Sequence, residues 1–93
     1  MYKHLTTHHY TFTSDNPLVK LNTTNNTIKF KQIVYTITSV QEVFNGYDYL
    51  MIYEAEAIRS GASTVRKYKL TLTEWEDLDD WEVVRSIYYR DIK

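Results

Sequence analysis

The side chains best suited to recognition are the acids between positions 74 and 82. Half of the chain's 12 acidic residues stand in this stretch, together with both tryptophans. Clustered carboxylates attract a basic partner, and exposed tryptophans anchor protein interfaces. The alternative is a capped helical turn whose tryptophans pack on the domain. We expect a partner-binding site made of Trp75, Glu76, Asp77, Asp79, Asp80 and Trp81.

Side chains that could perform catalysis or bind a metal are scarce. The acidic stretch lacks the glycine and the spaced glutamate of a calcium-binding loop. On a strand, His4 and His8 would share a face while His9 points away, so the three histidines do not converge as metal ligands. The chain has no cysteine and only 2 glycines, whereas nucleophile elbows and phosphate-binding loops depend on such residues. The sequence therefore predicts a protein that is not an enzyme and holds neither a metal nor a cofactor.

Cations gather between positions 57 and 73, a stretch without an acid. They are Arg59, Arg66, Lys67 and Lys69. Pairing of the two lysines with glutamates on a neighbouring strand would leave Arg59 and Arg66 as the candidate nucleic-acid contacts. Because the net charge is -1, binding to a phosphate backbone is the alternative function and not the leading one.

Two hairpins are expected to position these groups. Asn45-Gly46 is typical of a two-residue type I′ turn, and Gly61-Ala62 marks a second turn. Turn geometry sets the partners, and it places opposite charges together and apolar groups together. Across the first turn we predict the pairs Val40 and Met51, Thr38 and Tyr53, Thr36 and Ala55, and Val34 and Ala57; across the second, Ala55 and Tyr68, Tyr53 and Leu70, Met51 and Leu72, Glu56 and Lys67, and Glu54 and Lys69.

The first hairpin begins with a long run of β-branched and aromatic residues. Residues 28–44 therefore read as one strand, with a bulge or bend near Gln32-Ile33 where the apolar alternation slips by one. Before it we expect a short strand over 10–13, a turn at 15–17, an extended piece over 18–21 and a loop over 22–26.

This register divides the strands into two faces. The predicted core face consists of Val34, Val40, Met51, Tyr53, Ala55, Tyr68, Leu70 and Leu72. The second face carries apolar residues as well, which makes it a candidate self-association surface, for example of a homodimer. Its residues are Ile33, Tyr35, Ile37, Leu50 and Ile52. The alternative is cover by the N-terminal segment with Tyr10, Phe12, Leu18 and Leu21.

The remaining elements complete a small β domain. Thr73 and Glu76 match a capping box, so a short helix is expected over 74–80, followed by a last strand over 81–89. The fold class is mainly β: a small antiparallel barrel or strongly bent sheet, SH3-like in outline, with an OB-like barrel as the alternative. Residues 1–93 form one domain, in which residues 1–8 are expected to be disordered.

The function follows by exclusion. The absence of cysteine favours a reducing, cytoplasmic setting, and no apolar run approaches the roughly 18 residues of a membrane helix. We expect a non-enzymatic protein-protein interaction module that acts through its acidic, tryptophan-flanked segment. One version is a phage or mobile-element accessory protein that inhibits a host-defence protein. The alternative is a small-barrel nucleic-acid-binding protein.

Overall fold

The fold is known from a computed structural model that describes residues 1–13, 16, 18–44, 46, 49–75 and 80–92. The described residues form seven strands and no helix. The strands are β1 (Lys3–Thr13), β2 (Val19–Asn22), β3 (Thr27–Phe30), β4 (Ile33–Phe44), β5 (Tyr49–Ser60), β6 (Thr64–Trp75) and β7 (Asp80–Asp91).

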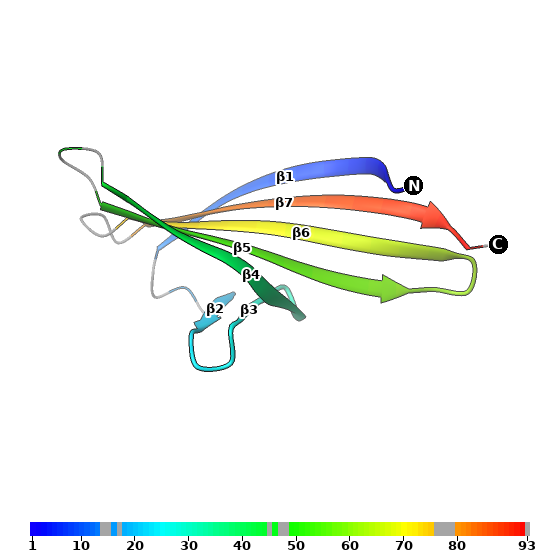
Figure 1. Ribbon diagram of the computed structural model, residues 1–93, viewed down its shortest axis with the longest axis horizontal. Coiled ribbons are helices and arrows are strands. Elements are labelled where there is room, and N and C mark those ends of the chain that lie inside the picture. The colour runs from blue at the N-terminus through cyan, green and yellow to red at the C-terminus, as the bar shows by residue number, and fades with distance from the viewer. Residues whose placement is uncertain (14–15, 17, 45, 47–48, 76–79, 93) are drawn as a thin grey trace.

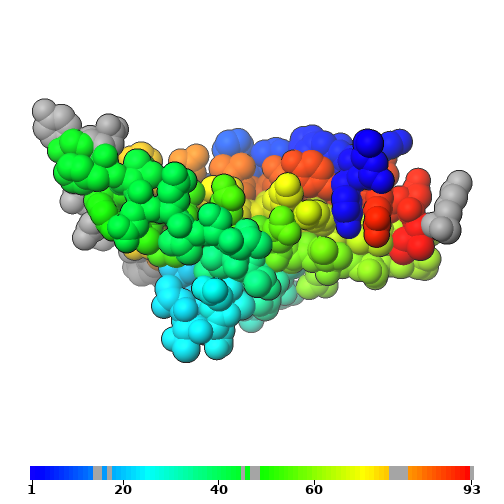
Figure 2. All heavy atoms as spheres, in the orientation of Figure 1, coloured from blue at the N-terminus to red at the C-terminus, as the bar shows by residue number. Residues whose placement is uncertain are grey.

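All seven strands belong to one antiparallel sheet in the order β1-β7-β6-β5-β4-β3-β2. The strands β1, β7, β6 and β5 run side by side along the long axis of 50 Å, whereas β4 crosses away from β5 toward the β2–β3 hairpin (Figure 1). The sheet is thereby curled into a half-barrel, and β2 and β3 project from one side of its elongated body (Figure 2).

The core lies on the concave side of the sheet, here called the inner face. Its buried members are Val19, Ile28, Phe30, Tyr35, Ile37, Tyr53, Ala55, Leu70, Leu72 and Val83. Tyr10 and Phe12 of β1 contact Phe30 of β3, with ring centroids 5.1 and 5.8 Å apart. These aromatic contacts join the first strand to the far side of the curled sheet.

The single strand predicted over 28–44 is wrong. Phe30 pairs with Ile33, so β3 and β4 form a hairpin, and its turn residues Lys31 and Gln32 have φ of 49° and 66°. Positive φ at two successive residues is the conformation of a type I′ turn. The slip in the apolar alternation near Gln32 therefore marks a reversal of the chain and not a bulge.

The predicted register between β4 and β5 is also wrong. Phe44 pairs with Tyr49, so the connection is longer than two residues, and Val40 lies opposite Tyr53 instead of Met51. Gly46 in this connection has φ of 70°, as the turn signal requires, whereas Asn45 lies outside the described residues.

The pairing of β4 with β5 also contains a bulge at Thr38. Ile37 pairs with Ala55 and Ser39 pairs with Glu54, so Thr38 is the extra residue between them. The Thr38 hydroxyl donates a hydrogen bond to the Glu54 carbonyl oxygen over 3.2 Å, which satisfies an acceptor at this bulge. Because side chains alternate between faces, the bulge moves Tyr35 and Ile37 onto the inner face.

The bulge and the curl explain which predicted core residues were misplaced. Tyr53, Ala55, Leu70 and Leu72 are buried as predicted, and Met51 and Tyr68 pack partly buried against them. Val34 and Val40 instead are about half exposed. Val34 faces outward because of the bulge, and Val40 lies beyond the part of β4 that β3 covers.

The second hairpin joins β5 to β6 as expected, but its register is shifted by two residues. Ala55 lies opposite Leu70, and Glu56 lies opposite Lys69. A shift of two keeps every side chain on its predicted face. The predicted ion pair between Glu56 and Lys67 is consequently still present, as a diagonal contact of 3.7 Å.

The helix predicted over 74–80 is not found in the described part of this segment. Glu74 and Trp75 end β6, Asp80 begins β7, and residues 76–79 lie outside the described residues. Thr73, the predicted helix cap, is a strand residue opposite Ile52 and Glu82. The architecture is therefore a mainly β half-barrel. Residues 3–8, where the sequence predicts disorder, lie in β1 and pair with β7.

Candidate partner-binding site

The sheet opens where β4 and β5 part. Their pairing ends at Thr36 and Glu56, because residues 33–36 of β4 turn away to pair with β3. β5 continues to Ser60 alongside β6. A cleft of about 680 Å³ lies in the angle between the two strands, lined by Gln32, Ile33, Val34, Thr36, Thr38, Glu56, Ala57, Ile58 and Arg59. We call this cleft the wedge.

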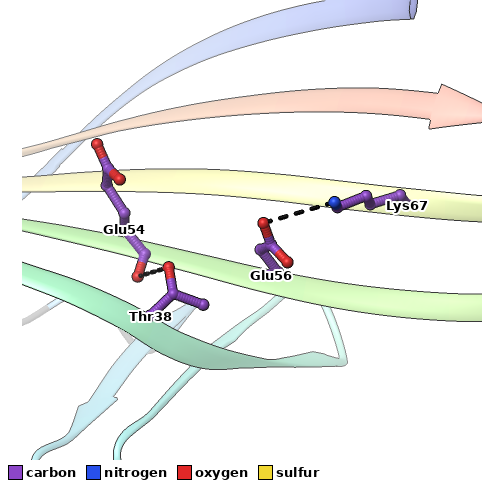
Figure 3. A network of polar contacts seen from close by, with 4 residues as sticks. All are labelled: Thr38, Glu54, Glu56 and Lys67. Carbon is purple, nitrogen blue, oxygen red and sulfur yellow. Dashed lines mark hydrogen bonds and ion pairs between the residues drawn. The ribbon is translucent and has the colours of Figure 1, made fainter. Parts of the chain in front are cut away.

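The outer rim of the wedge is apolar. Val34 of β4 and Ile58 of β5 alternate with inward-facing neighbours and are 54% and 61% exposed. Glu56, beside them on the outer face, is engaged by Lys67, as Figure 3 shows. An acid that is already paired leaves the two aliphatic side chains as the main contacts this rim offers.

The inner rim of the wedge is basic. Arg59 lies directly opposite Arg66 on β6, so both side chains leave the sheet on the inner face. The same cross-strand row continues with Tyr89 of β7 and Lys3 of β1. Both arginines are exposed, and no ion pair joins either one to another described residue. This row therefore carries positive charge without a described counter-ion.

Deeper on the inner face, two more cations meet at one phenol. Lys31 Nζ and Arg85 Nη2 donate hydrogen bonds of 3.2 and 3.4 Å to Tyr10 Oη. Arg85 Nε and Tyr35 Oη are buried without a hydrogen-bond partner. Burial raises the pKa of Tyr35 above its ordinary value of 10.0, and the nearby Arg85 guanidinium offsets part of that shift. These groups extend the positive potential of the inner face toward the core.

The acidic segment is divided by the sheet. Trp75, at the end of β6, lies on the outer face opposite Leu50, whereas Trp81 lies inward and packs against the core. Asp80 is exposed at the start of β7. Glu76, Asp77 and Asp79 lie outside the described residues. The two tryptophans thus sit on opposite faces, and only Trp75 lies outside the half-barrel.

The predicted self-association face is also divided. Tyr35 and Ile37 are buried in the core, and Ile33 packs partly buried against it. Leu50 and Ile52 lie on the outer face of β5 and are partly exposed. The alternative of cover by the N-terminal segment describes the inner face better. Tyr10, Phe12 and Leu21 pack against the core, while Leu18 is exposed.

The three histidines do not converge. The register shift after His4 places this residue opposite Tyr88 on the outer face, so His4 and His8 do not share a face as predicted. His4 Nε2 lies 2.8 Å from Thr7 Oγ1, and His9 Nδ1 lies 4.0 Å from Glu82 Oε1. In the described part of the chain, no three residues of the metal-binding types come together.

The apolar rim of the wedge is not recognisable from the sequence. Val34 and Ile58 look like ordinary strand residues in the sequence; the bulge at Thr38 turns Val34 outward, and Ile58 lies beyond the point where β4 leaves β5. Arg59 and Arg66, by contrast, were singled out by the absence of nearby acids, and the structure brings them together.

Across the described residues, no helix is long and apolar enough to cross a membrane.

Comparisons with known proteins found no relative of this chain. The chain matches no family model, and searches of curated proteins and of solved structures found no match.

Proposed function

We propose that this chain is a non-enzymatic interaction module that binds an extended segment of another protein as an added strand in the wedge. The observation that carries the proposal is the end of the β4–β5 pairing at Thr36 and Glu56. Beyond it, residues 57–60 pair with β6 on one side and have no β4 partner on the other, where residues 57–59 line the wedge. Strand addition uses main-chain hydrogen bonds for affinity and alternate side chains for specificity.

The other edges of the sheet support this choice by contrast. Natural sheets protect their edges with bulges, charges or short strands. β1 has a register shift between His4 and Thr6, and β2 is only 4 residues long and presents Lys20. The β5 segment beside the wedge has an exposed isoleucine and a length of about 13 Å, at about 3.3 Å per residue. It is the edge best suited to accept a strand.

A selection from a library of displayed random peptides tests the proposal, with the full chain as bait. Peptides that bind the wild type are then measured against Ile58→Glu, which places a charge on the apolar rim. We expect at least tenfold weaker binding, because the variant must desolvate a carboxylate against an apolar peptide side chain.

Phe44→Glu is the matched control, since Phe44 is an exposed apolar residue on β4 far from the wedge. It should bind the selected peptides as the wild type does. Equal binding of the peptides to all three proteins would place their site elsewhere and refute the proposal. Circular dichroism of each variant shows whether it is folded.

The acidic segment provides a second contact in this proposal. Trp75 and Asp80 lie at the end of the sheet opposite the 61–63 turn, so only a partner large enough to span the sheet would contact them and the wedge together. A cytoplasmic phage or mobile-element accessory protein that inhibits a host-defence protein is one version of such a module. Its support is the small, cysteine-free chain without a catalytic motif.

Nucleic-acid binding is the second candidate, and the arginine row favours it. Arg59, Arg66 and Lys3 lie in one row with Tyr89, which offers phosphate contacts beside a ring for base stacking. An electrophoretic shift series with single-stranded DNA tests it. Salt-sensitive binding that Arg66→Glu abolishes would support this candidate, and no shift at low salt would exclude it.

A further inference from the structure

We infer that the strand accepted by the wedge has an acidic side chain on the inner face, opposite Arg59, and an apolar side chain next to it on the outer face, opposite Ile58. This inference rests on the proposed function, and it names the chemistry of the partner. It follows from Arg59 and Ile58, which are neighbours on β5 and therefore point to opposite faces of the sheet.

The pair Arg59 and Arg66, here called the arginine pair, favours an acidic side chain on the added strand. Like charges directly opposite each other destabilise a pair of strands, so a carboxylate beside Arg59, on the side of β5 away from Arg66, offsets their repulsion as well as gaining hydrogen bonds. Asp91 at the end of β7 lies opposite Thr64 and forms no ion pair with either arginine. Glu56 is on the other face and is engaged by Lys67 (Figure 3). The described part of the chain thus leaves both guanidinium groups available.

The alternation follows from strand geometry. In an added strand, the residue opposite Arg59 points inward, the next residue lies opposite Ile58 and points outward, and the third lies opposite Ala57. The outward residue meets Ile58 and Val34, both more than half exposed. The inward residue opposite Ala57 lies beside Ile33, where β4 narrows the wedge. The preferred sequence is therefore acidic opposite Arg59, aliphatic opposite Ile58 and small opposite Ala57.

Three synthetic peptides test this inference against the full chain. Each has valine at the outward positions and alanine at the inward position opposite Ala57, and the three differ by glutamate, glutamine or lysine at the inward position opposite Arg59. We expect the glutamate peptide to bind about tenfold more tightly than the glutamine peptide, and the lysine peptide to bind weakest, because a charge-assisted hydrogen bond adds about that factor. Raising the salt concentration should narrow the difference.

Charge reversal gives the decisive comparison. Arg59→Glu should weaken binding of the glutamate peptide and strengthen binding of the lysine peptide, because Arg59 is the arginine that lines the wedge. Lys69→Glu is the matched control, since it changes the net charge equally but lies opposite Glu56 on the outer face. If Lys69→Glu had the same effect as Arg59→Glu, the overall charge and not Arg59 would set the preference for acids, and the inference would be refuted.

The outcomes separate this inference from the proposed function. Equal binding of the glutamate and glutamine peptides, lost in Ile58→Glu, would keep strand addition but overturn the acidic preference. Failure of all three peptides to bind would count against the proposed function itself. Binding of single-stranded DNA that competes with the glutamate peptide and depends on Arg66 would overturn the assignment of a protein partner.

Discussion

Removing the Tyr35 hydroxyl tests the description of the inner face most directly. Tyr35 is fully buried, and its Oη has no hydrogen-bond partner, although the Arg85 guanidinium lies nearby. A buried hydroxyl without a partner costs about 1–3 kcal/mol relative to water. The ring itself contributes to the core and makes an edge-on contact with Tyr68, with centroids 6.5 Å apart. Tyr35→Phe removes the hydroxyl and keeps the ring.

The expected gain in the free energy of unfolding for Tyr35→Phe is at the low end of that range of about 1–3 kcal/mol. Removal of the oxygen leaves a small void, and Arg85 Nε stays buried without a partner. We therefore expect the free energy of unfolding at neutral pH to rise by about 1 kcal/mol, which corresponds to a Tm increase of about 4–8 °C for a domain of this size. Arg85 keeps its hydrogen bond to Tyr10 in the variant.

Urea unfolding followed by tryptophan fluorescence measures this change. Tyr68→Phe is the control, since Tyr68 is only partly buried and contacts the same ring. Its stability should stay within about 0.5 kcal/mol of the wild type. A loss of 1 kcal/mol or more in Tyr35→Phe would refute the reasoning, because it would mean that the hydroxyl is paired, with Arg85 as the candidate donor.

The same variant should change the response to alkali. Burial raises the pKa of Tyr35 and of Tyr53 above 10.0, so both keep their protons in the folded chain at a pH where the unfolded chain loses them. The unfolded state then binds fewer protons, and stability falls as the pH rises past about 10, by up to about 1.4 kcal/mol per pH unit for each such tyrosine. Tyr35→Phe should make this decline shallower.

Three further experiments test the local geometry, each by urea unfolding. Gln32→Gly should stabilise the β3–β4 hairpin by about 0.5–1 kcal/mol because φ is 66°, and a loss of stability would argue against a type I′ turn. Gly46→Ala should cost about 1 kcal/mol, since φ is 70° and the space around it is open; a neutral result would mean that the turn adapts. A double-mutant cycle of Glu56→Gln and Lys67→Met should give a coupling of about 0.2–1 kcal/mol that fades in high salt, whereas a salt-independent value would contradict a partly exposed ion pair.

The sequence predicted the features that depend on local pattern. Two hairpins in the chain order β4–β5–β6 follow from turn residues and β-branched runs, and the structure contains both. The contact between Glu56 and Lys67 survived a wrong register because a shift of two residues preserves the face. The face on which a strand side chain lies was therefore predicted more reliably than the residue opposite it.

The features that failed depend on single residues without a sequence signature. Lys31 and Gln32 adopt positive φ although neither is a glycine, an asparagine or an aspartate, so the β3–β4 turn resembled a bulge. The bulge at Thr38 carries no distinctive residue either, yet it moves Tyr35 and Ile37 into the core. The wedge results from both events, which is why its apolar rim could not be predicted.

The pairing of β1 with β7 has a consequence for how the chain folds. Lys3 lies opposite Tyr89, so β1 pairs with β7, the strand that is farthest from it along the sequence. Strands β2 to β7 can assemble by successive hairpins, but Tyr10 and Phe12 cover Phe30 only when β1 returns across the whole length of the chain. Such long-range pairing raises the contact order, and proteins of this kind fold in milliseconds to seconds. Before β1 pairs with β7, Phe30 lacks the cover of Tyr10 and Phe12, and exposed apolar surface of this kind favours aggregation during folding.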